Sequence, residues 1–594
     1  MTVDLTFKND KYAEVYDKEY TDKMNYLAKV IMEYETGENE FNVFNFEAGL
    51  GKSYTVDKVL SDCVIDWDIK KKFLIVKRFN EESVKSLEFI EHDFVQNSIA
   101  ITYENWKEWQ CKLEDLQWQK VIFISHQRYI ALCEDDAMRE VFSKNRDVLI
   151  IDEKVNFPVY TFNDNRYIEI FGILPNGLRD SLAKVCKPLN EFIEMQKTLK
   201  NTNKIIPNKF NIHPLTLRNF INEVQVAIDN YTIQDLDKRL TIINFVKELE
   251  FFYSSQCIYN SGNISTYNPK HRHWGLKNNI ILDASAGIDG VYSCNPNKYS
   301  LVKQSRIIDH KDCRFNVIKF NSSKTKVNTY SEQYFKEMAE RIVATKKADD
   351  FILIVGHKDF AKRIHEQLIQ IYDENSIWID KRDKKNDPDY ADQPIAISWY
   401  GNLIGKNWAE GFTQCWLVST PNIPLEQYLI HFLHYSDDKI GNKSTKVHRG
   451  RYRNHFFNDI QRGYIASEMY QSLKRIQRNP MPKGEFFITV EDEEIIEMVL
   501  SQIKNAEVSD EIELEFMKKI REEKEKQKQE NKQPDQVDRF IEYIMKLGKG
   551  RYKKSEIASE LKISKINRVL SDVRTKSLLH KKLEIHNRYI EILR

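Results

Sequence analysis

The chain has 594 residues, of which 41% are hydrophobic and 30% charged, so it has the composition of a globular protein with roughly three to five domains. No apolar run approaches the ~18 residues that span a bilayer, and the N-terminus lacks a basic stretch followed by an apolar one. We therefore expect no membrane segment and no secretory signal, and predict a cytoplasmic protein. The eight cysteines form no C-x-x-C pair, which argues against a zinc ribbon, a disulfide framework or a four-cysteine iron–sulfur cluster.

The sequence at 45–60, NFEAGLGKSYTVDKVL, predicts a nucleotide phosphate loop. Residues 41–46 alternate as a strand does, helical spacing begins after Ser53, and Phe46 stands where the pattern G-x-x-x-x-G-K-[ST] has glycine. At such a junction backbone N–H groups hold phosphate oxygens, Lys52 neutralises the β/γ charge and the Ser53 hydroxyl joins the Mg²⁺ shell. A glycine-containing turn with an incidental Lys-Ser is the alternative. The residues predicted to bind nucleotide here are Ala48, Gly49, Leu50, Gly51, Lys52, Ser53 and Tyr54.

Residues 147–153, DVLIIDE, form an apolar run that ends in two carboxylates. A buried parallel strand delivers such residues to the C-terminal edge of its sheet. There Asp152 would hold Mg²⁺, directly or through water, and Glu153 would orient and polarise the water that attacks the γ-phosphate of ATP. The alternative is a strand that ends in an acidic turn. Because apolar runs at 72–76 and 121–125 supply further parallel strands, we predict an NTPase.

A second α/β series occupies the C-terminal half. An apolar strand at 279–283 is followed by strands near 314–320, 351–355, 377–379, 395–399 and 415–419, with helical stretches at 331–346 and 360–372 between them. Near its end, Arg475 and Arg478 lie three residues apart and share one helical face. Opposed across a cleft, such an arginine reaches the γ-phosphate and stabilises the transition-state charge. An exposed basic helix is the alternative.

The order of these motifs resembles that of the superfamily 2 helicases, the DEAD/DEAH-like translocases of the type found in phages and mobile elements, over roughly residues 30–155 and 276–480. The matching stretches are the phosphate loop at 47–53, the acidic box at 152–154, an S-A-T-like element at 283–286 and Q-x-x-x-R-x-x-R at 471–478. The resemblance implies two RecA-like lobes that bind ATP between them and nucleic acid across their tops. It also implies that Gln471 and Gly405 contact nucleotide, that Lys77, Arg78, His126 and Gln127 contact strand phosphates, and that Ser285 couples hydrolysis to movement.

Four positions depart from the family pattern. Phe46 replaces a small residue, Lys154 replaces the usual Ala or His of the acidic box, Lys474 stands where Gly is common, and the element at Gly405 lacks G-x-D. These departures bear on processive unwinding more than on ATP hydrolysis.

The predicted organisation is α/β, with two parallel-sheet lobes, an α-helical insertion and a C-terminal winged helix. The insertion serves equally well as a strand clamp or as a surface for packing or a protein partner. The expected divisions are lobe 1 at 1–155, the insertion at 156–275, a return to lobe 1 at 276–300, lobe 2 at 301–505, a charged linker at 506–535 and the winged helix at 536–594.

The C-terminal stretch is basic, since residues 536–594 carry 15 Lys+Arg against 7 Asp+Glu. Helices are predicted at 537–547, 554–561 and 564–579, followed by two short strands around 586–587, an order that resembles a winged helix-turn-helix. Protein docking is the alternative use, but the positive charge favours duplex DNA. The residues expected at the duplex are Lys565, Asn567, Arg568 and Arg574 on the third helix, and Arg588 on the wing.

The leading interpretation is an ATP- and Mg²⁺-dependent DNA helicase or translocase that serves the replication, maintenance or defence of a mobile element. A DNA-binding regulator that uses ATP as a conformational switch is the second interpretation. An RNA helicase is the third, disfavoured because an A-form major groove is too narrow for a recognition helix.

Overall fold

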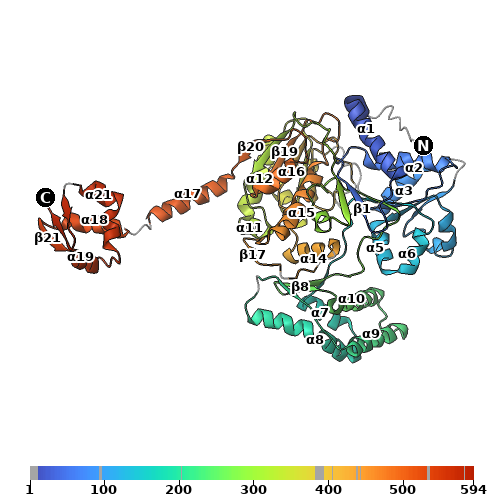
Figure 1. Cartoon of the computed structure of the whole chain (residues 1–594), viewed down its shortest axis with the longest axis horizontal. Coiled ribbons are helices and arrows are strands. Elements are labelled where there is room, and N and C mark those ends of the chain that lie inside the picture. The colour runs from blue at the N-terminus through green and yellow to red at the C-terminus, as the bar shows by residue number, and fades with distance from the viewer. Residues whose placement is uncertain are drawn as a thin grey trace. The chain divides into compact units, whose positions relative to one another are not determined.

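The computed structural model describes residues 11–92, 96–201, 204–380, 393–403, 406–436, 439–441, 443–530, 535–580 and 582–593. The chain forms two compact units, Met1–Ile512 and Glu513–Arg594 (Figure 1). In these described ranges no helix combines the length and the apolarity needed to cross a membrane.

Seven parallel strands form the sheet of the first lobe. The central strands are runs of fully buried aliphatic residues, as expected for a parallel sheet that is covered on both faces. A strand that follows the acidic box by more than 100 residues in the sequence inserts between the phosphate-loop strand and the acidic-box strand. The order across the sheet is β11 (Tyr299–Val302), β1 (Phe41–Phe44), β10 (Asn278–Leu282), β5 (Val148–Asp152), β2 (Phe73–Lys77), β4 (Val121–Ser125) and β3 (Ser98–Ile101).

Helices cover both faces of this sheet and complete two apolar cores. One core contains Tyr20, Leu27 and Phe46 beside the inner face of the sheet, and the other contains Tyr129 and Phe142 on the opposite face. The helices are α1 (Lys11–Glu33), α2 (Lys52–Ile65), α3 (Asn80–Ile90), α4 (Trp106–Trp109), α5 (His126–Glu134) and α6 (Asp136–Ser143).

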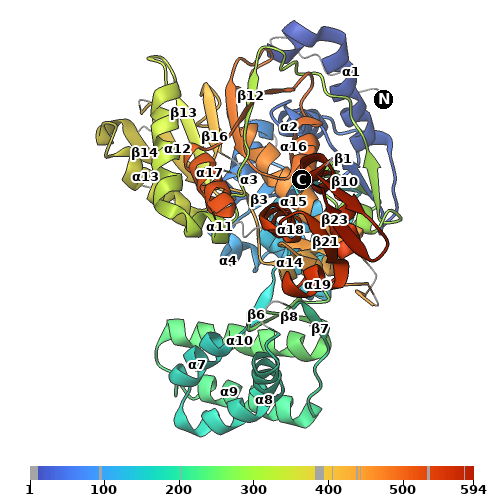
Figure 2. The same ribbon diagram turned by 90° about the vertical axis from the view of Figure 1, so that its left-hand side faces the viewer.

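The segment between the acidic box and β10 builds a separate helical layer on a small antiparallel sheet. Figure 2 shows α7–α10 grouped together and joined to the rest of the unit through β6, β7 and β8. The region at 215–252 forms two helices with a break between them. The elements are β6 (Tyr160–Phe162), α7 (Asp164–Ile173), α8 (Asn176–Thr198), β7 (Ile206–Asn208), α9 (Pro214–Asp229), α10 (Leu236–Ser254), β8 (Cys257–Asn260) and β9 (Asn263–Thr266), with sheet order β6-β9-β8-β7.

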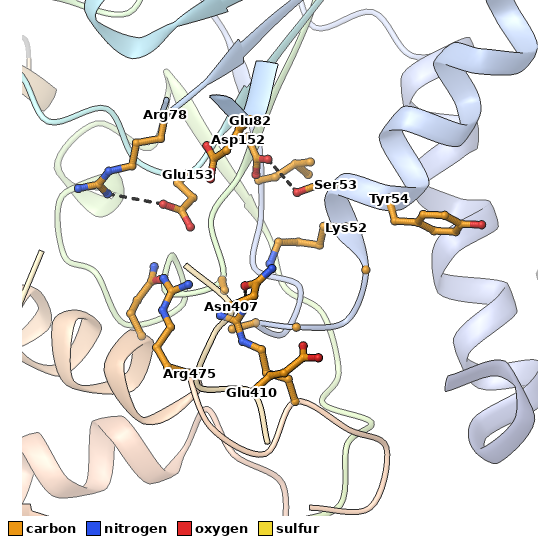
Figure 3. Close-up of a pocket in the computed structure, with 17 residues that line it drawn as sticks. Lys52, Ser53, Tyr54, Arg78, Glu82, Asp152, Glu153, Asn407, Glu410 and Arg475 are labelled. Atoms are coloured by element: carbon orange, nitrogen blue, oxygen red, sulfur yellow. Dashed lines mark hydrogen bonds and ion pairs between the residues drawn. The ribbon is translucent and has the colours of Figure 1, made fainter. Parts of the chain in front are cut away.

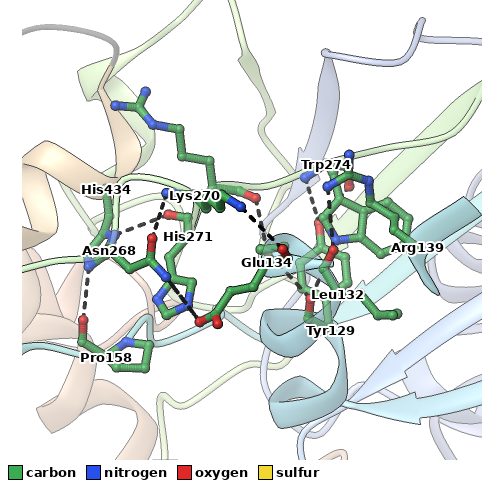
Figure 4. A network of polar contacts seen from close by, with 12 residues as sticks. Tyr129, Leu132, Glu134, Arg139, Pro158, Asn268, Lys270, His271, Trp274 and His434 are labelled. Carbon is green, nitrogen blue, oxygen red and sulfur yellow. Dashed lines mark hydrogen bonds and ion pairs between the residues drawn. The ribbon is translucent and has the colours of Figure 1, made fainter. Parts of the chain in front are cut away.

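A polar network ties the end of this inserted segment to the first lobe (Figure 4). The Tyr129 hydroxyl donates to the carbonyl oxygen of Trp274 at 2.6 Å, and Glu134 Oε1 lies 2.6 Å from His271 Nε2. His434 Nδ1 lies 3.2 Å from the carbonyl oxygen of His271. Because burial lowers the pKa of His271, this anchor is held mainly by neutral hydrogen bonding rather than by a full ion pair.

The second lobe contains another seven-stranded, fully parallel sheet. Its strand order is β14 (Ile377–Ile379), β15 (Ile395–Trp399), β13 (Ile352–Gly356), β16 (Gln414–Leu417), β19 (Glu485–Thr489), β12 (Arg314–Ile318) and β20 (Val508–Ile512). Two such sheets confirm the predicted α/β class with two parallel-sheet lobes. Its helices are α11 (Lys324–Thr329), α12 (Ser331–Thr345), α13 (Lys358–Leu368), α14 (Leu425–Tyr435), α15 (His455–Leu473) and α16 (Glu493–Leu500), with a short hairpin of β17 (Val447–His448) and β18 (Arg451–Tyr452).

One sequence-based expectation is wrong at this lobe. The charged linker does not begin at residue 506, because β20 pairs in parallel with β12 at the edge of the sheet. Its side chains from Val508 to Glu511 are exposed, so the strand is held by its backbone and shows no apolar alternation.

Helix α14 belongs to the second lobe by sequence and to the first lobe by packing. Tyr428, Leu429, Phe432 and Tyr435 join the apolar core that contains the β4 and β5 side chains of the first sheet. This shared core fixes the two lobes against each other on the side of the inserted segment.

The second unit has its own small core around Phe540, Ile557 and Ile590. The predicted third helix at 564–579 is interrupted, because the Asp572 side chain accepts the N–H of Arg574 and starts a new helix there. The unit contains α17 (Glu515–Glu530), α18 (Gln536–Lys546), β21 (Gly550–Lys553), α19 (Lys554–Glu560), α20 (Ile566–Ser571), α21 (Val573–Leu579), β22 (Leu583–Ile585) and β23 (Tyr589–Ile592), with the antiparallel sheet order β21-β23-β22.

Candidate nucleotide site between two parallel sheets

The glycine-containing loop joins β1 to α2 in the way the sequence predicts. Gly49 and Gly51 both have a φ of +85°, in the left-handed region that favours glycine. Helix α2 begins at Lys52 without a side-chain cap, so its first N–H groups face the loop unpartnered by any capping side chain. Such a helix start is suited to bind the oxygens of a phosphate.

Phe46 does not obstruct this loop. Its side chain is fully buried and stacks on Phe44, with ring centroids 5.7 Å apart and planes 10° apart. The aromatic ring belongs to the core on one face of the sheet, so only the glycines at 49 and 51 shape the loop itself.

The acidic pair ends β5 beside this loop. Ser53 Oγ donates to Asp152 Oδ2 at 2.8 Å, and Lys77 Nζ lies 3.1 Å from the same oxygen. Burial alone raises the pKa of Asp152, but Lys77, the Ser53 hydroxyl and Lys52 together hold it below its ordinary value. Asp152 is therefore ionised at neutral pH. Glu153 follows with a φ of +68°, a strained conformation for a residue with a side chain.

The two predicted arginines approach from the second lobe. Arg475 and Arg478 lie beyond the end of α15 at Leu473, so the expectation that they share one helical face is wrong. Arg478 nevertheless lies so close to the loop that a Cβ added at Gly49 would contact its side chain at 3.5 Å. Arg478 Nε donates to the carbonyl oxygen of Lys474 at 2.7 Å. Arg475 is 4% exposed, and burial together with the charge of Arg478 lowers its pKa to about 9. Two guanidinium groups thus face the loop across the lobe boundary.

These side chains surround one cavity of about 300 Å³ (Figure 3). The loop and the acidic pair line one side of the cavity, and Asn407, Glu410, Gln471 and the two arginines line the other. In the figure Lys52 and Arg475 point toward the same space, whereas Tyr54 points away from it. Predicted residues in the lining are Ala48, Gly49, Gly51, Lys52, Ser53, Tyr54, Asp152, Glu153, Gln471, Arg475 and Arg478.

One predicted nucleotide contact does not join this set, and another cannot be compared with it. Leu50 is buried in the core and is absent from the lining, because its side chain points into the protein. Gly405 lies outside the described residues.

Lys52 donates to the carbonyl oxygens of Glu47 at 3.2 Å and Phe46 at 3.4 Å, and burial lowers its pKa.

Asn407 belongs to the element at 400–407 that the family resemblance relates to nucleotide sensing, whereas two acidic lining residues, Glu82 and Glu410, were missed by sequence reasoning. Glu82 lies in the first turn of α3, just after the C-terminal end of β2. Because binding sites of α/β sheets lie at the carboxyl ends of their strands, this position could have identified Glu82 from the sequence. Burial, Glu153 and Asp152 raise the pKa of Glu82 to about 7. The cavity therefore contains a carboxyl group that titrates near neutral pH.

The residues that the resemblance assigned to a nucleic-acid strand have other surroundings. Lys77 is 3% exposed and pairs with Asp152, which leaves it no surface to offer to a strand. His126 is also buried, donates from Nε2 to the carbonyl oxygen of Asp152 at 2.9 Å, and has its pKa lowered to about 4 by burial. Arg78 lines the nucleotide cavity, and Gln127 is exposed.

Ser285 is buried between the two lobes. Its hydroxyl donates to Asp283 Oδ1 at 2.6 Å, and Gln471 Nε2 reaches it at 3.5 Å. It contacts an element of each lobe, rather than an exposed surface.

The two lysines that depart from the family pattern both lie at the lobe boundary, where Lys474 is buried and Lys154 is half-buried. Lys154 pairs with the buried carboxylate of Asp289 and lies 5.1 Å from the ring centroid of Tyr464 on α15. Lys474 donates to His310 Nε2 at 2.9 Å, and burial lowers its pKa to about 8. Each lysine thus joins α15 to a segment that adjoins the first lobe.

In the second unit, the five predicted duplex contacts are all exposed: Lys565, Asn567, Arg568, Arg574 and Arg588. Arg574 differs from the others because it contacts three carboxylates, Asp535 at 2.7 Å, Asp538 at 2.9 Å and Asp572 at 3.3 Å. These ion pairs connect α21 to α18 and occupy the guanidinium group that was predicted to contact DNA.

Comparison with known proteins places the fold rather than the activity. No protein-family model and no curated protein sequence matches the chain. The apo structure of XPD matches with a TM-score of 0.51 and 13% identity, over 83% of this chain and 100% of that chain. Xpd4 of S. tokodaii matches with 0.49 and 13% over 82% and 99%, and the DUF1998 helicase MrfA bound to DNA with 0.35 and 9% over 100% and 63%.

Of these three, XPD alone exceeds a TM-score of 0.5. An identity of 13% shows a shared fold and nothing finer. Together with the two parallel sheets, this likeness shows that the chain contains two RecA-like lobes.

Proposed function

We propose that this chain is an ATP- and Mg²⁺-dependent DNA helicase or translocase. The observation that carries the proposal is the single cavity in which Lys52, the acidic pair and two arginines of the other lobe converge. Such a site changes its shape when the lobes move, so nucleotide turnover and lobe movement are coupled.

The proposed chemistry assigns each side chain a task at the triphosphate. Lys52 exchanges its two backbone carbonyl partners for the β- and γ-phosphate oxygens. Glu153 orients the attacking water and takes up its proton, while Arg475 and Arg478 stabilise the charge that develops on the γ-phosphoryl group.

The donor set at Ser53 and Asp152 fits Mg²⁺. A hydroxyl and an ionised carboxylate stand 2.8 Å apart at the loop, and both are hard oxygen ligands. Ser53 would bind the ion directly and Asp152 directly or through water, and the ion would supply charge neutralisation at the phosphates.

The second unit is the proposed duplex-binding module, with a winged helix that contacts DNA through its exposed cations. Lys565, Arg568 and Arg588 are the residues that support this assignment. The inserted helical layer at 156–275 is proposed to bind a protein partner or to clamp the strand. The second lobe, at 301–505 and extended to β20, is proposed to move against the first lobe.

The test is the rate of ATP hydrolysis with no nucleic acid, with single-stranded DNA, with duplex DNA and with RNA. We expect DNA to stimulate turnover strongly, and Lys52→Ala to reduce it by about 100-fold or more while duplex binding persists. Lys112→Ala serves as a matched control, because Lys112 is on the surface of the first lobe and pairs with Glu108 at 2.8 Å.

The same assay separates the other two interpretations. An ATP-switched DNA-binding regulator would show little stimulation by any nucleic acid, and an RNA helicase would prefer RNA. Either result would refute the proposed DNA motor.

A further inference from the structure

Arg78 of the first lobe contacts the carboxylate that is proposed to orient the attacking water. It follows β2 directly, and β2 is the hydrogen-bonded neighbour of β5, which ends in the acidic pair. Arg78 Nη1 lies 3.5 Å from Glu153 Oε2, and Figure 3 shows the two side chains directed at each other across the edge of the cavity. Both side chains line the same cavity as Lys52.

Glu153 is held in place by few other contacts. Its backbone N–H donates to the carbonyl oxygen of Leu282 at 3.0 Å, which fixes the main chain at a φ of +68°. Within the described ranges the carboxylate has no hydrogen bond or other ion pair besides Arg78. Because the Glu153 backbone is strained and its carboxylate has a single side-chain partner, the carboxylate can adopt a second conformation when Arg78 moves away.

The pair is also accessible to a competing anion. The side chains of Arg78 and Glu153 are 21% and 29% exposed, so the pair is neither sealed in the core nor fully in solvent. A guanidinium group offers five N–H donors, and the 3.5 Å contact uses it loosely. A phosphate that enters the cavity therefore meets an arginine that is paired but not saturated.

We propose that Arg78 is a positioning residue that holds the Glu153 carboxylate while the cavity is empty and exchanges it for the γ-phosphate when ATP binds. This inference rests on the proposed function, because it takes the cavity as an ATP site. The exchange releases Glu153 beside the γ-phosphate only when a triphosphate is present, so the water-orienting group becomes competent only in the loaded enzyme.

The exchange has a signature in binding that does not depend on turnover. Glu153→Gln removes the competitor for Arg78, so a triphosphate should bind more tightly. It also removes a negative charge near the phosphates, and that effect is independent of Arg78. A double-mutant cycle separates the two causes, because only the competition disappears when Arg78→Gln is already present.

The experiment titrates a fluorescent, non-hydrolysable ATP analogue and the matching ADP derivative, with Mg²⁺, into the full chain. The four proteins are the wild type, Arg78→Gln, Glu153→Gln and the double variant. We expect Glu153→Gln to tighten analogue binding about three- to tenfold more with Arg78 present than without it, the size of a partly exposed charge pair. With ADP, which lacks the γ-phosphate, the two factors should be equal.

Two results would overturn the proposal in different ways. Equal tightening by Glu153→Gln in both backgrounds, within about twofold, would leave charge repulsion as the whole cause and remove the exchange. A wild-type chain that binds neither probe would overturn the proposed function together with it. Arg314→Gln is the control, because Arg314 lies on β12 and pairs with Asp510 outside the cavity.

Discussion

Replacing Arg475 with methionine should stabilise the nucleotide-free protein while abolishing catalysis. Arg475 is 4% exposed. Among the described residues its Nε has no hydrogen-bond partner, and Nη1 donates to the carbonyl oxygen of Lys406 at 3.3 Å. Burial and the nearby Arg478 lower its pKa from 12.5 to about 9. A buried cation with so few partners is suited to bind an anionic ligand.

The magnitude follows from these contacts. A pKa lowered from 12.5 to about 9 corresponds to an unfavourable environment of at most about 5 kcal/mol, a figure that includes the cost of the orphaned buried N–H. Methionine fills a similar apolar volume without this cost but loses the contacts of the guanidinium group, so the variant should gain about 1–2 kcal/mol. Because the first unit is large, its thermal transition should rise by only about 1–2 °C, while turnover should fall about 10³-fold or more.

The assay is thermal unfolding with and without a non-hydrolysable ATP analogue, beside ATPase rates. The wild type should be stabilised more by the analogue than the variant is, because phosphate satisfies the orphaned donor. Arg462→Met is the contrast: it removes the arginine partner of Glu494 and one of the two arginine partners of Asp492, outside the cavity, and should lower the transition. A variant that melts several degrees lower than the wild type, yet keeps its turnover, would refute the reasoning.

Three further experiments test the buried charges and the second unit. Lys474→Met should remove a pH dependence of stability, because the pKa of Lys474 is about 8 in the folded protein and 10.5 in the unfolded chain. Between these pH values the unfolded state binds more protons, so the stability of the wild type should rise with pH by up to about 3 kcal/mol relative to the variant. Urea unfolding measures this difference, and a difference that stays constant with pH would contradict the prediction. Lys154→Met should lower the free energy of unfolding by about 3–5 kcal/mol, because it removes the ion-pair partner of the buried Asp289. Adding Asp289→Asn should restore most of that free energy, as measured by denaturant midpoints. Additive losses in the double variant would show that the two residues are not coupled. Lys565→Ala should weaken duplex binding and reduce its salt slope by about one, while Arg574→Ala should mainly lower the melting temperature of the second unit; equal losses of affinity would argue against this division of roles.

The sequence alone determined the loop, the acidic pair and the two lobes, because each depends on local rules. Alternation over 41–46, glycines at 49 and 51, and an apolar run ending at Asp152 specify a strand, a turn and a sheet edge without reference to the rest of the chain. Burial of Phe46 also follows from alternation, although the motif letters by themselves suggest a mismatch.

Tertiary structure alone decided which charged side chains face the cavity and which form ion pairs with other residues of the protein. Lys77 and Arg78 are adjacent in the sequence, yet Lys77 pairs with Asp152 in the interior while Arg78, just beyond the end of β2, meets Glu153 at the cavity. The edge strand β20 and the ion pairs of Arg574 likewise depend on partners distant in the sequence. Which strands pair, and which opposite charges meet, depends on the residues that folding brings together from distant parts of the chain. A local sequence pattern does not contain that information.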